Sequence, residues 1–483
     1  MDHITVRELK GATSGKLICG DDDGSFTGLC TDSRIFEDGD MFVALAGENT
    51  DGHDYIEDVI KKGCGVLLVS EENSADRLKK LFEEMNCRAG KTESLDEKRT
   101  FSAVLVPDTL VALQAFTGWY LEKIAPGKIA VTGSVGKTST RDMVYHILSE
   151  KYRTGKPIKN YNSDVGIPLT VAGFSGDTEM AVLEQGMEFP GEIHRLAAMT
   201  RPDVAIITNI GISHLENLGT RENIYRAKME ITDFFGENNV LIINESNDML
   251  SKEKILKECA GKYNVVSVGK TGVEDYVVSD IADKGVDGVE FTLATGEKRQ
   301  RFGVPIPGAH NAINAALAIA ACDLYDVTWK QAASGLSKVE LTGKRMKVRE
   351  TGGIKILDDS YNAAPDSVKS AIRTMENSEC TRRIAVLGAM NELGDDTPAY
   401  HREVGEFAAD HGVDILIGIG RKAKDIVEGA KMYGIETLYF EKKEELYPEL
   451  LKIVETGDLI LTKASMTEHF WEIADKITEL ERE

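Results

Sequence analysis

The chain of 483 residues has few of the residues that mark specialised protein classes: 11 prolines, 3 tryptophans and 7 cysteines. The cysteines are scattered and never form a Cys-x-x-Cys pair, which argues against a disulfide framework or a zinc site and favours a reducing cytoplasm. No apolar run approaches the ~20 residues that a membrane span needs. Met1–Lys10 lacks the pattern of a secretory signal. We therefore expect a cytoplasmic protein without a membrane span.

Positive charge is also scarce, because 57 Lys and Arg stand against 80 Asp and Glu, a formal net charge of −23. An acidic surface repels nucleic-acid backbones at long range, so we expect no nucleic-acid partner. Small phosphorylated ligands are still compatible with this charge, since a local cationic loop or a bound metal overrides the average field. The composition, 42% hydrophobic and 28% charged, is that of a globular protein and excludes bulk disorder.

The length of the chain, at about 150 residues per domain, and changes in the pattern of strand-like and helical runs predict three α/β domains. Residues 1–105 mix short strand-like runs with helical ones and end in a charged segment, Cys87–Thr100, that predicts a loop or a poor helix. Residues 106–340 repeat strand, turn and helix, which is typical of parallel strands joined by crossover helices. Residues 341–483 show the clearest alternation of strands and helices.

Short apolar runs rich in β-branched residues define the expected strands of the second and third segments. In the second segment they are Ile129–Thr132, Ala181–Glu184, Val204–Asn209 and Val240–Asn244, followed by an expected antiparallel patch between Val265 and Val304. In the third they are Ile354–Asp358, Arg383–Leu387, Asp414–Ile419, Thr437–Phe440 and Asp458–Thr462. Two helices are expected to begin at Pro365 and at Thr397-Pro398, because proline is tolerated in the first helical turn.

The strongest single feature is a glycine-rich loop between a predicted strand and a helix expected over Thr140–Glu150. The loop consists of Gly133, Ser134, Val135, Gly136, Lys137, Thr138 and Ser139. Such glycines let backbone N–H groups turn towards a polyphosphate, and the helix N-terminus adds positive potential. We expect Lys137 to neutralise the β- and γ-phosphates and Thr138 to ligate Mg²⁺. The first glycine lies three residues before Gly136, not five as in the general P-loop, so a chance glycine-rich turn is the alternative.

Two other strand ends carry candidate metal ligands. Glu184 closes the strand Ala181–Glu184, at the edge where a parallel sheet binds ligands, and is a candidate for the carboxylate that holds a phosphate-bound metal. A solvated carboxylate at a strand end is the alternative. His214 follows Val204–Asn209; a lone histidine is usually structural, but one in a loop beside a phosphate site is a candidate ligand.

Lys228 lies on the apolar stripe of a helix predicted over Glu222–Phe235, in line with Ile224 and Ile231. Such a lysine either extends its amine to solvent or is buried. Burial lowers the pKa of the amine and frees the neutral form. A neutral amine can add CO₂ to form a carbamate, which turns a cation into an anionic oxygen ligand.

In combination, these motifs resemble the Mur ligases of peptidoglycan synthesis. The segments that carry the resemblance are Thr132–Thr138, Thr208–His214, Arg226–Glu230 and His310–Asn314. Three further stretches resemble the member that joins D-alanyl-D-alanine (D-Ala-D-Ala) to a UDP-muramyl-tripeptide: Asn160–Leu169, Asp358–Ser367, and Leu387–Gly394 with Tyr400–Gly405. The Asp-Asn-Pro-Arg signature usual in the sister enzyme that adds the third residue is missing. Thr31–Arg34 and Phe42–His53 resemble the family's UDP-sugar-binding domain.

The resemblance implies a fold, a reaction and two small-molecule substrates. The fold is a small N-terminal α/β UDP-binding domain (1–105), a central P-loop ATPase domain with a parallel sheet (106–340) and a C-terminal Rossmann-like α/β domain (341–483). The reaction is ATP- and Mg²⁺-dependent amide formation through an acyl phosphate. The substrates are the UDP-muramyl-tripeptide and D-alanyl-D-alanine, and we expect a monomer.

The resemblance also implies roles for individual residues. Lys137, His214 and Lys228 are the expected catalytic residues, with Lys228 matching a lysine that is carbamylated in several members. ATP contacts are expected from the glycine-rich loop and from Asn311, Arg345 and Asp359. The expected metal ligands are Thr138, Glu184, His214 and Lys228. The expected substrate-binding residues are Ser33, Asn160, Asn162 and Ser163.

Four positions depart from the family pattern, and they put substrate contacts in doubt more than ATP chemistry. The departures are Ser163 for the usual Asn, Ala389 for Asp, Lys463-Ala464-Ser465 for Lys-Gly-Ser, and Gln185 at a commonly apolar position. One alternative function is that of another Mur-type or folylpolyglutamate-synthase-like ligase. The other is a nucleotide-responsive binding protein that kept the fold and lost the chemistry.

Overall fold

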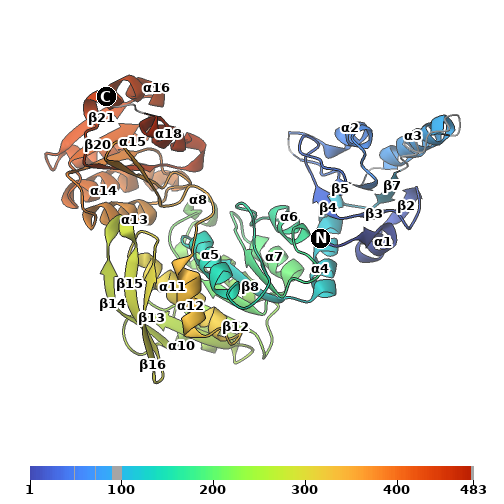
Figure 1. Ribbon diagram of the computed structural model, residues 1–483, viewed down its shortest axis with the longest axis horizontal. Coiled ribbons are helices and arrows are strands. Elements are labelled where there is room, and N and C mark those ends of the chain that lie inside the picture. Colours follow the sequence, from blue (N-terminus) through green and yellow to red (C-terminus); the bar gives the residue numbers. More distant parts are fainter. Residues whose placement is uncertain (48, 71, 90–100, 480–483) are drawn as a thin grey trace. The chain divides into compact units, whose positions relative to one another are not determined.

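We analysed a computed structural model, which describes residues 1–479 apart from residues 48, 71 and 90–100 (Figure 1). The chain divides into two compact units. The first unit consists of Met1–Lys128, Arg153–Leu183 and Arg195–Arg201, and the second of Ile129–Tyr152, Glu184–His194 and Pro202–Glu483. The domain boundaries after residues 105 and 340 stay predictions.

The first unit contains a five-stranded sheet with helices between its strands. The strand order is β2 (Lys16–Cys19), β7 (Ser102–Leu105), β6 (Val66–Val69), β5 (Asp40–Val43) and β4 (Gly28–Cys30). All neighbouring strands are parallel except β2 and β7. The main helices are α1 (Val6–Thr13), α2 (Ile56–Lys61), α3 (Glu72–Ala89) and α4 (Thr109–Ile124). The segment Cys87–Thr100, expected as a loop or a poor helix, begins inside α3, and its residues 90–100 lie outside the described part.

The core of the first unit combines side chains from distant parts of the chain. Phe26 and residues of α4 such as Phe116 pack with Ile167 of α6 (Gly166–Ala172) and with Leu196. The amino group of Met1 donates to the carbonyl of Ala172 at 2.8 Å. This unit also contains the parallel pair β9 (Thr154–Gly155) and β10 (Met180–Glu184), except for Glu184, which belongs to the second unit.

The first sheet of the second unit begins with parallel strands, as expected. Its strands are, in order, β8 (Gly127–Thr132), β11 (Val204–Ile207), β12 (Val240–Asn244), β13 (Asn264–Gly269), β14 (Tyr276–Asp283), β15 (Val289–Thr295) and β16 (Lys298–Val304). The expected antiparallel patch is confirmed for β14, β15 and β16. Strand β13 instead pairs parallel with β12, because the crossover helix α10 (Lys252–Cys259) joins the two.

Two helices of this region lie close to the glycine-rich loop. Helix α5 (Lys137–Leu148) starts three residues before the predicted Thr140, because Gly136 takes a left-handed conformation (φ 82°) and lets the helix begin at once. Helix α11 (His310–Asp323) is buried along almost its whole length.

The last sheet has six strands: the five predicted ones, which are confirmed, and one strand that was not predicted, β17 (Lys347–Thr351). The order is β17, β18 (Ile354–Asp358), β22 (Asp458–Lys463), β19 (Arg382–Leu387), β20 (Ile415–Ile419) and β21 (Glu436–Phe440), all parallel except β17. The main helices are α13 (Pro365–Glu376), α14 (Thr397–Asp410), α15 (Ala423–Lys431) and α18 (Trp471–Thr478). Helices α13 and α14 begin at the two proline positions that the sequence predicts.

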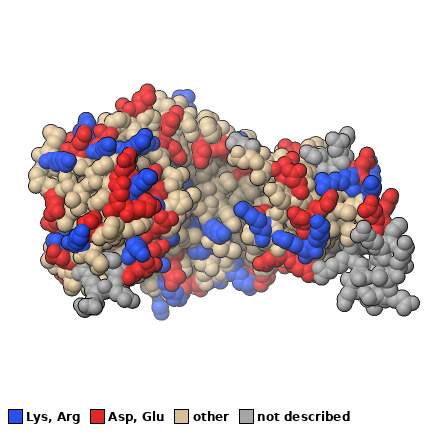
Figure 2. All heavy atoms as spheres, turned by 90° about the horizontal axis from the view of Figure 1, so that it is seen from above, with Lys and Arg blue, Asp and Glu red and all other residues tan. Residues whose placement is uncertain are grey.

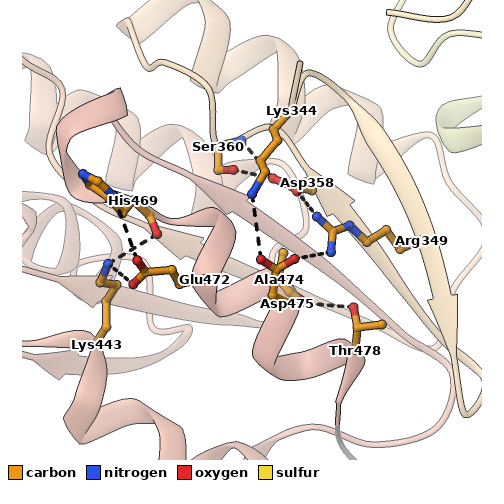
Figure 3. Close-up of polar contacts among 10 residues, drawn as sticks. All are labelled: Lys344, Arg349, Asp358, Ser360, Lys443, His469, Glu472, Ala474, Asp475 and Thr478. Atoms are coloured by element: carbon orange, nitrogen blue, oxygen red, sulfur yellow. Dashed lines mark hydrogen bonds and ion pairs between the residues drawn. The ribbon is translucent and has the colours of Figure 1, made fainter. Parts of the chain in front are cut away.

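Figure 3 shows a polar cluster that ties α18 to β17 and β18. Arg349 donates one hydrogen bond to Asp358 Oδ2 and one to Asp475 Oδ1, each at 2.6 Å. Lys344 Nζ lies 3.8 Å from the other oxygen of Asp475, and the Ser360 hydroxyl donates to Asp358. We call Arg349, Asp358 and Asp475 the C-terminal brace.

The surface mixes both signs of charge. On the face drawn in Figure 2, acidic and basic side chains lie interspersed with uncharged surface. Ion pairs such as Lys443 with Glu472 (2.7 Å) and Lys252 with Asp275 (2.6 Å) neutralise part of this charge locally. None of the helices in the described part of the chain combines the length and apolar character of a transmembrane segment.

Candidate active site

The glycine-rich loop follows β8 and is held from the neighbouring strand. Gly133 has a φ of 148°, and a Cβ there would lie 1.9 Å from Thr208 Oγ1, so only glycine fits. The side-chain oxygen of Asn209 accepts the N–H of Val135 at 2.9 Å, and its carbonyl accepts the N–H of Ser134 at 3.1 Å. Strand β11 therefore ends at Ile207, two residues before the prediction, because the next residues turn to brace the loop.

Lys137 folds back over this loop. Its Nζ donates to the carbonyls of Gly133 (2.8 Å) and Ser134 (3.3 Å). Desolvation lowers the pKa of this amine from its ordinary value, and the nearby Glu184 carboxylate partly offsets the effect. The Lys137 amine therefore lies against the carbonyls of the loop, and its expected role at the phosphates stays a prediction.

Four polar side chains form a buried cluster beside the loop, and we call Thr138, Arg141, Asp142 and Glu184 the phosphate-edge cluster. Glu184 Oε2 accepts the Thr138 hydroxyl at 2.8 Å and Arg141 Nη1 at 3.1 Å. Arg141 also donates to Asp142 Oδ1 from Nε (3.1 Å) and Nη2 (2.8 Å). Glu184 is 1% exposed, so the alternative of a solvated strand-end carboxylate is wrong. Neither Arg141 nor Asp142 was a predicted site residue.

Lys228 is 1% exposed, which excludes the alternative of an amine that extends to solvent. Its helix, α9 (Arg221–Met229), is shorter than predicted and continues as a 3-10 turn over Glu230–Thr232. Ile224 and Ile231 are buried on the same stripe. Burial and the neighbouring charge of Lys137 move the pKa of Lys228 well below its ordinary value.

His214 contacts the carboxylate of Glu392, which was not a predicted site residue. Its Nδ1 lies 2.6 Å from Glu392 Oε2, and both residues have left-handed backbones (φ 64° and 63°). The contact with His214 lowers the pKa of Glu392, against the opposing effect of burial, and Lys137 lowers it further. The loop after β19 therefore reaches the same part of the second unit as the glycine-rich loop.

Arg345 and Asp359, the expected ATP contacts near the start of the last sheet, are both held by neighbours. The Arg345 guanidinium lies 3.5 Å from the ring centre of Tyr361. Asp359 accepts the N–H of Met346 at 3.1 Å and pairs with Lys463, which is buried. Lys463 precedes Ala464, the residue that departs from the family pattern in this segment. The structure shows that the Lys463 amine pairs with the Asp359 carboxylate.

Asn311 lies in the first turn of α11. Its amide donates to the carbonyl of Pro307 at 2.7 Å, and its side-chain oxygen accepts the amide of Asn314 at 3.0 Å. The expected role of Asn311 at adenine stays a prediction.

The four expected substrate-binding residues all belong to the first unit. Asn162 donates to the side chain of Asn160 at 3.2 Å, and Ser163 Oγ accepts the N–H of Gly166 at the start of α6. The carbonyl of Ser33 accepts Lys62 Nζ at 2.5 Å. Their roles stay predictions.

Comparisons with known proteins identify the family. The profile "Mur ligase middle domain" matches residues 131–322, "Mur ligase, glutamate ligase domain" matches 344–466, and "Mur ligase family, catalytic domain" matches 25–99. The chain is 35% identical over 456 residues to the UDP-N-acetylmuramoyl-tripeptide–D-alanyl-D-alanine ligase of Bacillus subtilis (strain 168), covering 94% of this chain and 93% of that protein. The chain belongs to the Mur ligase family.

Solved structures agree with this assignment. Crystal structure I of MurF from Acinetobacter baumannii matches 99% of this Mur ligase and 100% of its own chain, with a TM-score of 0.86 and 27% identity. MurF from Thermotoga maritima, crystallised with ADP, matches 94% and 97%, with a TM-score of 0.76 and 25% identity. The predicted three-domain α/β fold class is confirmed, and so is the predicted family.

Proposed function

We propose that this Mur ligase joins the amino group of D-alanyl-D-alanine to the terminal carboxylate of a UDP-N-acetylmuramoyl-tripeptide, with conversion of ATP to ADP and phosphate. The observation that carries the proposal is the match of almost the whole chain to a relative with that name. A ligase for a single amino acid has less support, because relatives that match about nine tenths of the chain carry the D-alanyl-D-alanine ligase name. A catalytically inactive binding protein has less support, because the chain contains Lys137, Thr138 and Glu184. A cytoplasmic location follows from the nucleotide substrates.

The reaction needs activation of a carboxylate, because its anionic oxygen is a poor leaving group. Attack of that oxygen on the γ-phosphorus of ATP breaks the bond to the β-γ bridging oxygen and releases ADP. The amine then attacks the acyl phosphate, phosphate leaves, and the amine loses one proton. The first step brings two anions together, so cationic groups at the γ-phosphate control its rate.

Lys137 is the protein's cation for this task. Two unit charges 4 Å apart interact by about 4 kcal/mol at an effective dielectric constant of ~20. That energy corresponds to about three powers of ten in rate. The N–H groups of Gly133–Ser139 would hold the phosphates, and Asn311, Arg345 and Asp359 would contact the rest of the nucleotide.

The donor set fits Mg²⁺ bound together with a nucleotide. Thr138 and Glu184 offer the hard oxygen atoms that Mg²⁺ prefers. The described residues contain no group of three or more His, Cys, Asp and Glu side chains placed to hold a metal alone, so substrate phosphates would complete the shell. Mg²⁺ would offset the charge that develops on the transferred phosphoryl group. His214 and Lys228 are the further ligands that we propose.

Lys228 would act as its carbamate. The neutral amine attacks CO₂, a C–N bond forms, and one proton leaves, so that the buried cation becomes an anionic oxygen donor. Lys228→Ala should therefore lose activity that short carboxylic acids partly restore. Absence of any rescue would count against the carbamate.

The muramyl peptide would bind to the first unit, through Ser33, Asn160, Asn162 and Ser163. We base this assignment on their positions in the motifs quoted above. Alanine variants of Asn160 and Asn162 should raise KM for the UDP-muramyl-tripeptide and leave KM for ATP unchanged.

The deciding experiment measures ADP release from the purified protein with ATP, Mg²⁺, a UDP-muramyl-tripeptide and one amino acceptor at a time. Release that depends on D-alanyl-D-alanine supports the proposal, whereas dependence on a free amino acid indicates another ligase of the family. No release with any acceptor would indicate a binding protein. Lys137→Ala is the negative control for ADP release and should lower kcat about a thousandfold.

A further inference from the structure

Arg141 is the largest side chain that is fully buried in the described part of the chain. It lies one helical turn after Lys137 on α5, directly beside the candidate phosphate site. A buried guanidinium is costly unless carboxylates compensate its charge and accept its hydrogen bonds. The burial of Arg141 therefore depends on the carboxylates that it contacts.

Arg141 bridges two carboxylates from different parts of the chain. It donates to Glu184 at the end of β10 (3.1 Å) and to Asp142 on its own helix (2.8 Å and 3.1 Å). The Thr138 hydroxyl donates to the same oxygen of Glu184 that Arg141 contacts. Two donors from α5 thus fix one oxygen of the candidate metal-binding carboxylate.

The charges of this cluster do not cancel. One guanidinium faces two carboxylates, so the phosphate-edge cluster carries one net negative charge in a desolvated site. Asp142 is compensated from both sides, by the guanidinium and by Thr342, whose N–H and hydroxyl donate to it at 2.7 Å and 3.2 Å. Glu184 accepts hydrogen bonds from Thr138 and Arg141 and interacts electrostatically with the Lys137 amine, which suits a carboxylate at a site for phosphate and a cation.

The bonds of Asp142 extend the cluster to the start of the last sheet. The carbonyl of Thr342 accepts Arg345 Nη1 at 3.2 Å. A continuous series of hydrogen bonds thus runs from Glu184 through Arg141 and Asp142 to Thr342 and Arg345. Arg345 is a proposed ATP contact, so both ends of the series lead to groups of the same site.

We propose that Arg141 is a positioning residue, which fixes the Glu184 carboxylate for the divalent cation that accompanies ATP and links it, through Asp142, to the Thr342–Arg345 segment. This inference rests on the proposed function, since it needs Glu184 to meet a cation. If Arg141 only filled the core, it would still need carboxylate partners. Only the positioning role requires that one of them, Glu184, binds a cation.

Two variants of Arg141 and one control variant separate positioning from packing. Arg141→Met keeps the volume and removes both bridges. Arg141→Lys keeps the charge, but a single ammonium cannot reproduce the forked contact with two carboxylates. Arg382→Met is the matched control, because Arg382 also makes a two-bond contact with a buried carboxylate, that of Asp458 (2.8 Å and 2.9 Å). Both residues lie at the N-terminal ends of the parallel strands β19 and β22.

The experiment titrates each full-length protein with Mn²⁺ in the presence of a non-hydrolysable ATP analogue and measures free Mn²⁺ by electron paramagnetic resonance. Arg141→Met and Arg141→Lys should weaken Mn²⁺ binding by about 10- to 100-fold, the usual effect of losing a group that orients a metal ligand. Arg382→Met should bind Mn²⁺ as the unaltered protein does. Asp142→Asn should weaken binding less than Arg141→Met, because the contact with Glu184 persists.

Equal Mn²⁺ affinity in the unaltered protein and in the folded Arg141 variants would overturn the inference and leave Arg141 a packing residue. If Arg141→Met does not fold, Arg141→Lys decides the question by the same measurement. ADP release by the unaltered protein is recorded in parallel. Missing release with D-alanyl-D-alanine would refute the proposed function, whereas unchanged Mn²⁺ affinity with normal release would refute only the role of Arg141.

Discussion

The phosphate-edge cluster and the C-terminal brace use the same chemistry in different surroundings. In each, one arginine joins two aspartate or glutamate side chains and connects a helix to a strand end. Arg141 and both of its carboxylates are buried almost completely. Arg349 is 19% exposed and Asp475 is 48% exposed, so one of the two carboxylates of the brace contacts solvent.

This difference shows why the contacts alone do not reveal the role of an arginine. Solvent screens an exposed ion pair and keeps its contribution to stability small. Removing one partner of a buried pair leaves an uncompensated charge, which costs much more. The brace can therefore stabilise the attachment of α18, whereas the phosphate-edge cluster holds a buried carboxylate, Glu184, beside the Lys137 amine and the glycine-rich loop.

The largest contrast is expected from removing the two arginines. Arg141→Met should lower the free energy of unfolding by about 3–5 kcal/mol, because it removes the guanidinium that compensates two buried carboxylates. Arg349→Met should lower the free energy of unfolding by about 1–3 kcal/mol, because only one of its two carboxylate partners, Asp358, is buried. Urea unfolding followed by circular dichroism measures both. Equal losses would show that the exposure of Asp475 does not matter and would contradict the proposed difference between the two clusters.

Lysine substitutions should give the next largest difference. A lysine retains the charge but loses the fork, so Arg141→Lys should cost about 2 kcal/mol of unfolding free energy. Arg349→Lys should cost about 1 kcal/mol, because water replaces the lost bond to Asp475. The same urea titrations test this, and a costlier change at Arg349 would contradict it.

Salt should distinguish the clusters through the coupling energy of each pair. At 1 M salt the screening length is about 3 Å, so exposed charges interact little. A double-mutant cycle for Arg349 and Asp475 should give about 0.5 kcal/mol at low salt and almost nothing in 1 M NaCl. The cycle for Arg141 and Asp142 should not change with salt. A salt-sensitive coupling there would mean that water reaches the cluster.

The smallest effect is expected at the exposed end of the brace. Asp475→Asn removes one charge from Arg349 but keeps an oxygen that can accept its hydrogen bond, so we expect a loss of unfolding free energy below about 1 kcal/mol. ADP release should be unchanged. A large loss of activity would mean that α18 influences the nucleotide site, which would remove the distinction between the two clusters.

The strands and the loop chemistry were predictable because they depend on local patterns. Apolar runs ended at Thr132 and Glu184, and glycines preceded Lys137, so these residues could be assigned before any contact was known. The start of α5 was predicted too late, because the helix begins directly after a left-handed glycine that the apolar pattern does not reveal.

The partners of the site residues could not be predicted, because tertiary pairing over long separations decides them. Asp142 bonds to Thr342, 200 positions away, and Lys463 pairs with Asp359, 104 positions away. Arg141 looks like an ordinary polar residue of a helix until the buried face of α5 is known. The sequence feature that could have indicated these two residues is an Arg-Asp pair in a helix whose other residues are mostly apolar or small.

The discontinuous make-up of the first unit limits how the protein can be dissected. A gene fragment that stops at residue 105 or 128 would omit Ile167, Val171 and Leu196, which pack with Phe26 and Phe116. The truncated product would present that apolar surface to water and should aggregate. A recombinant version for ligand screening would have to restore residues 153–183 and 195–201 through engineered connections.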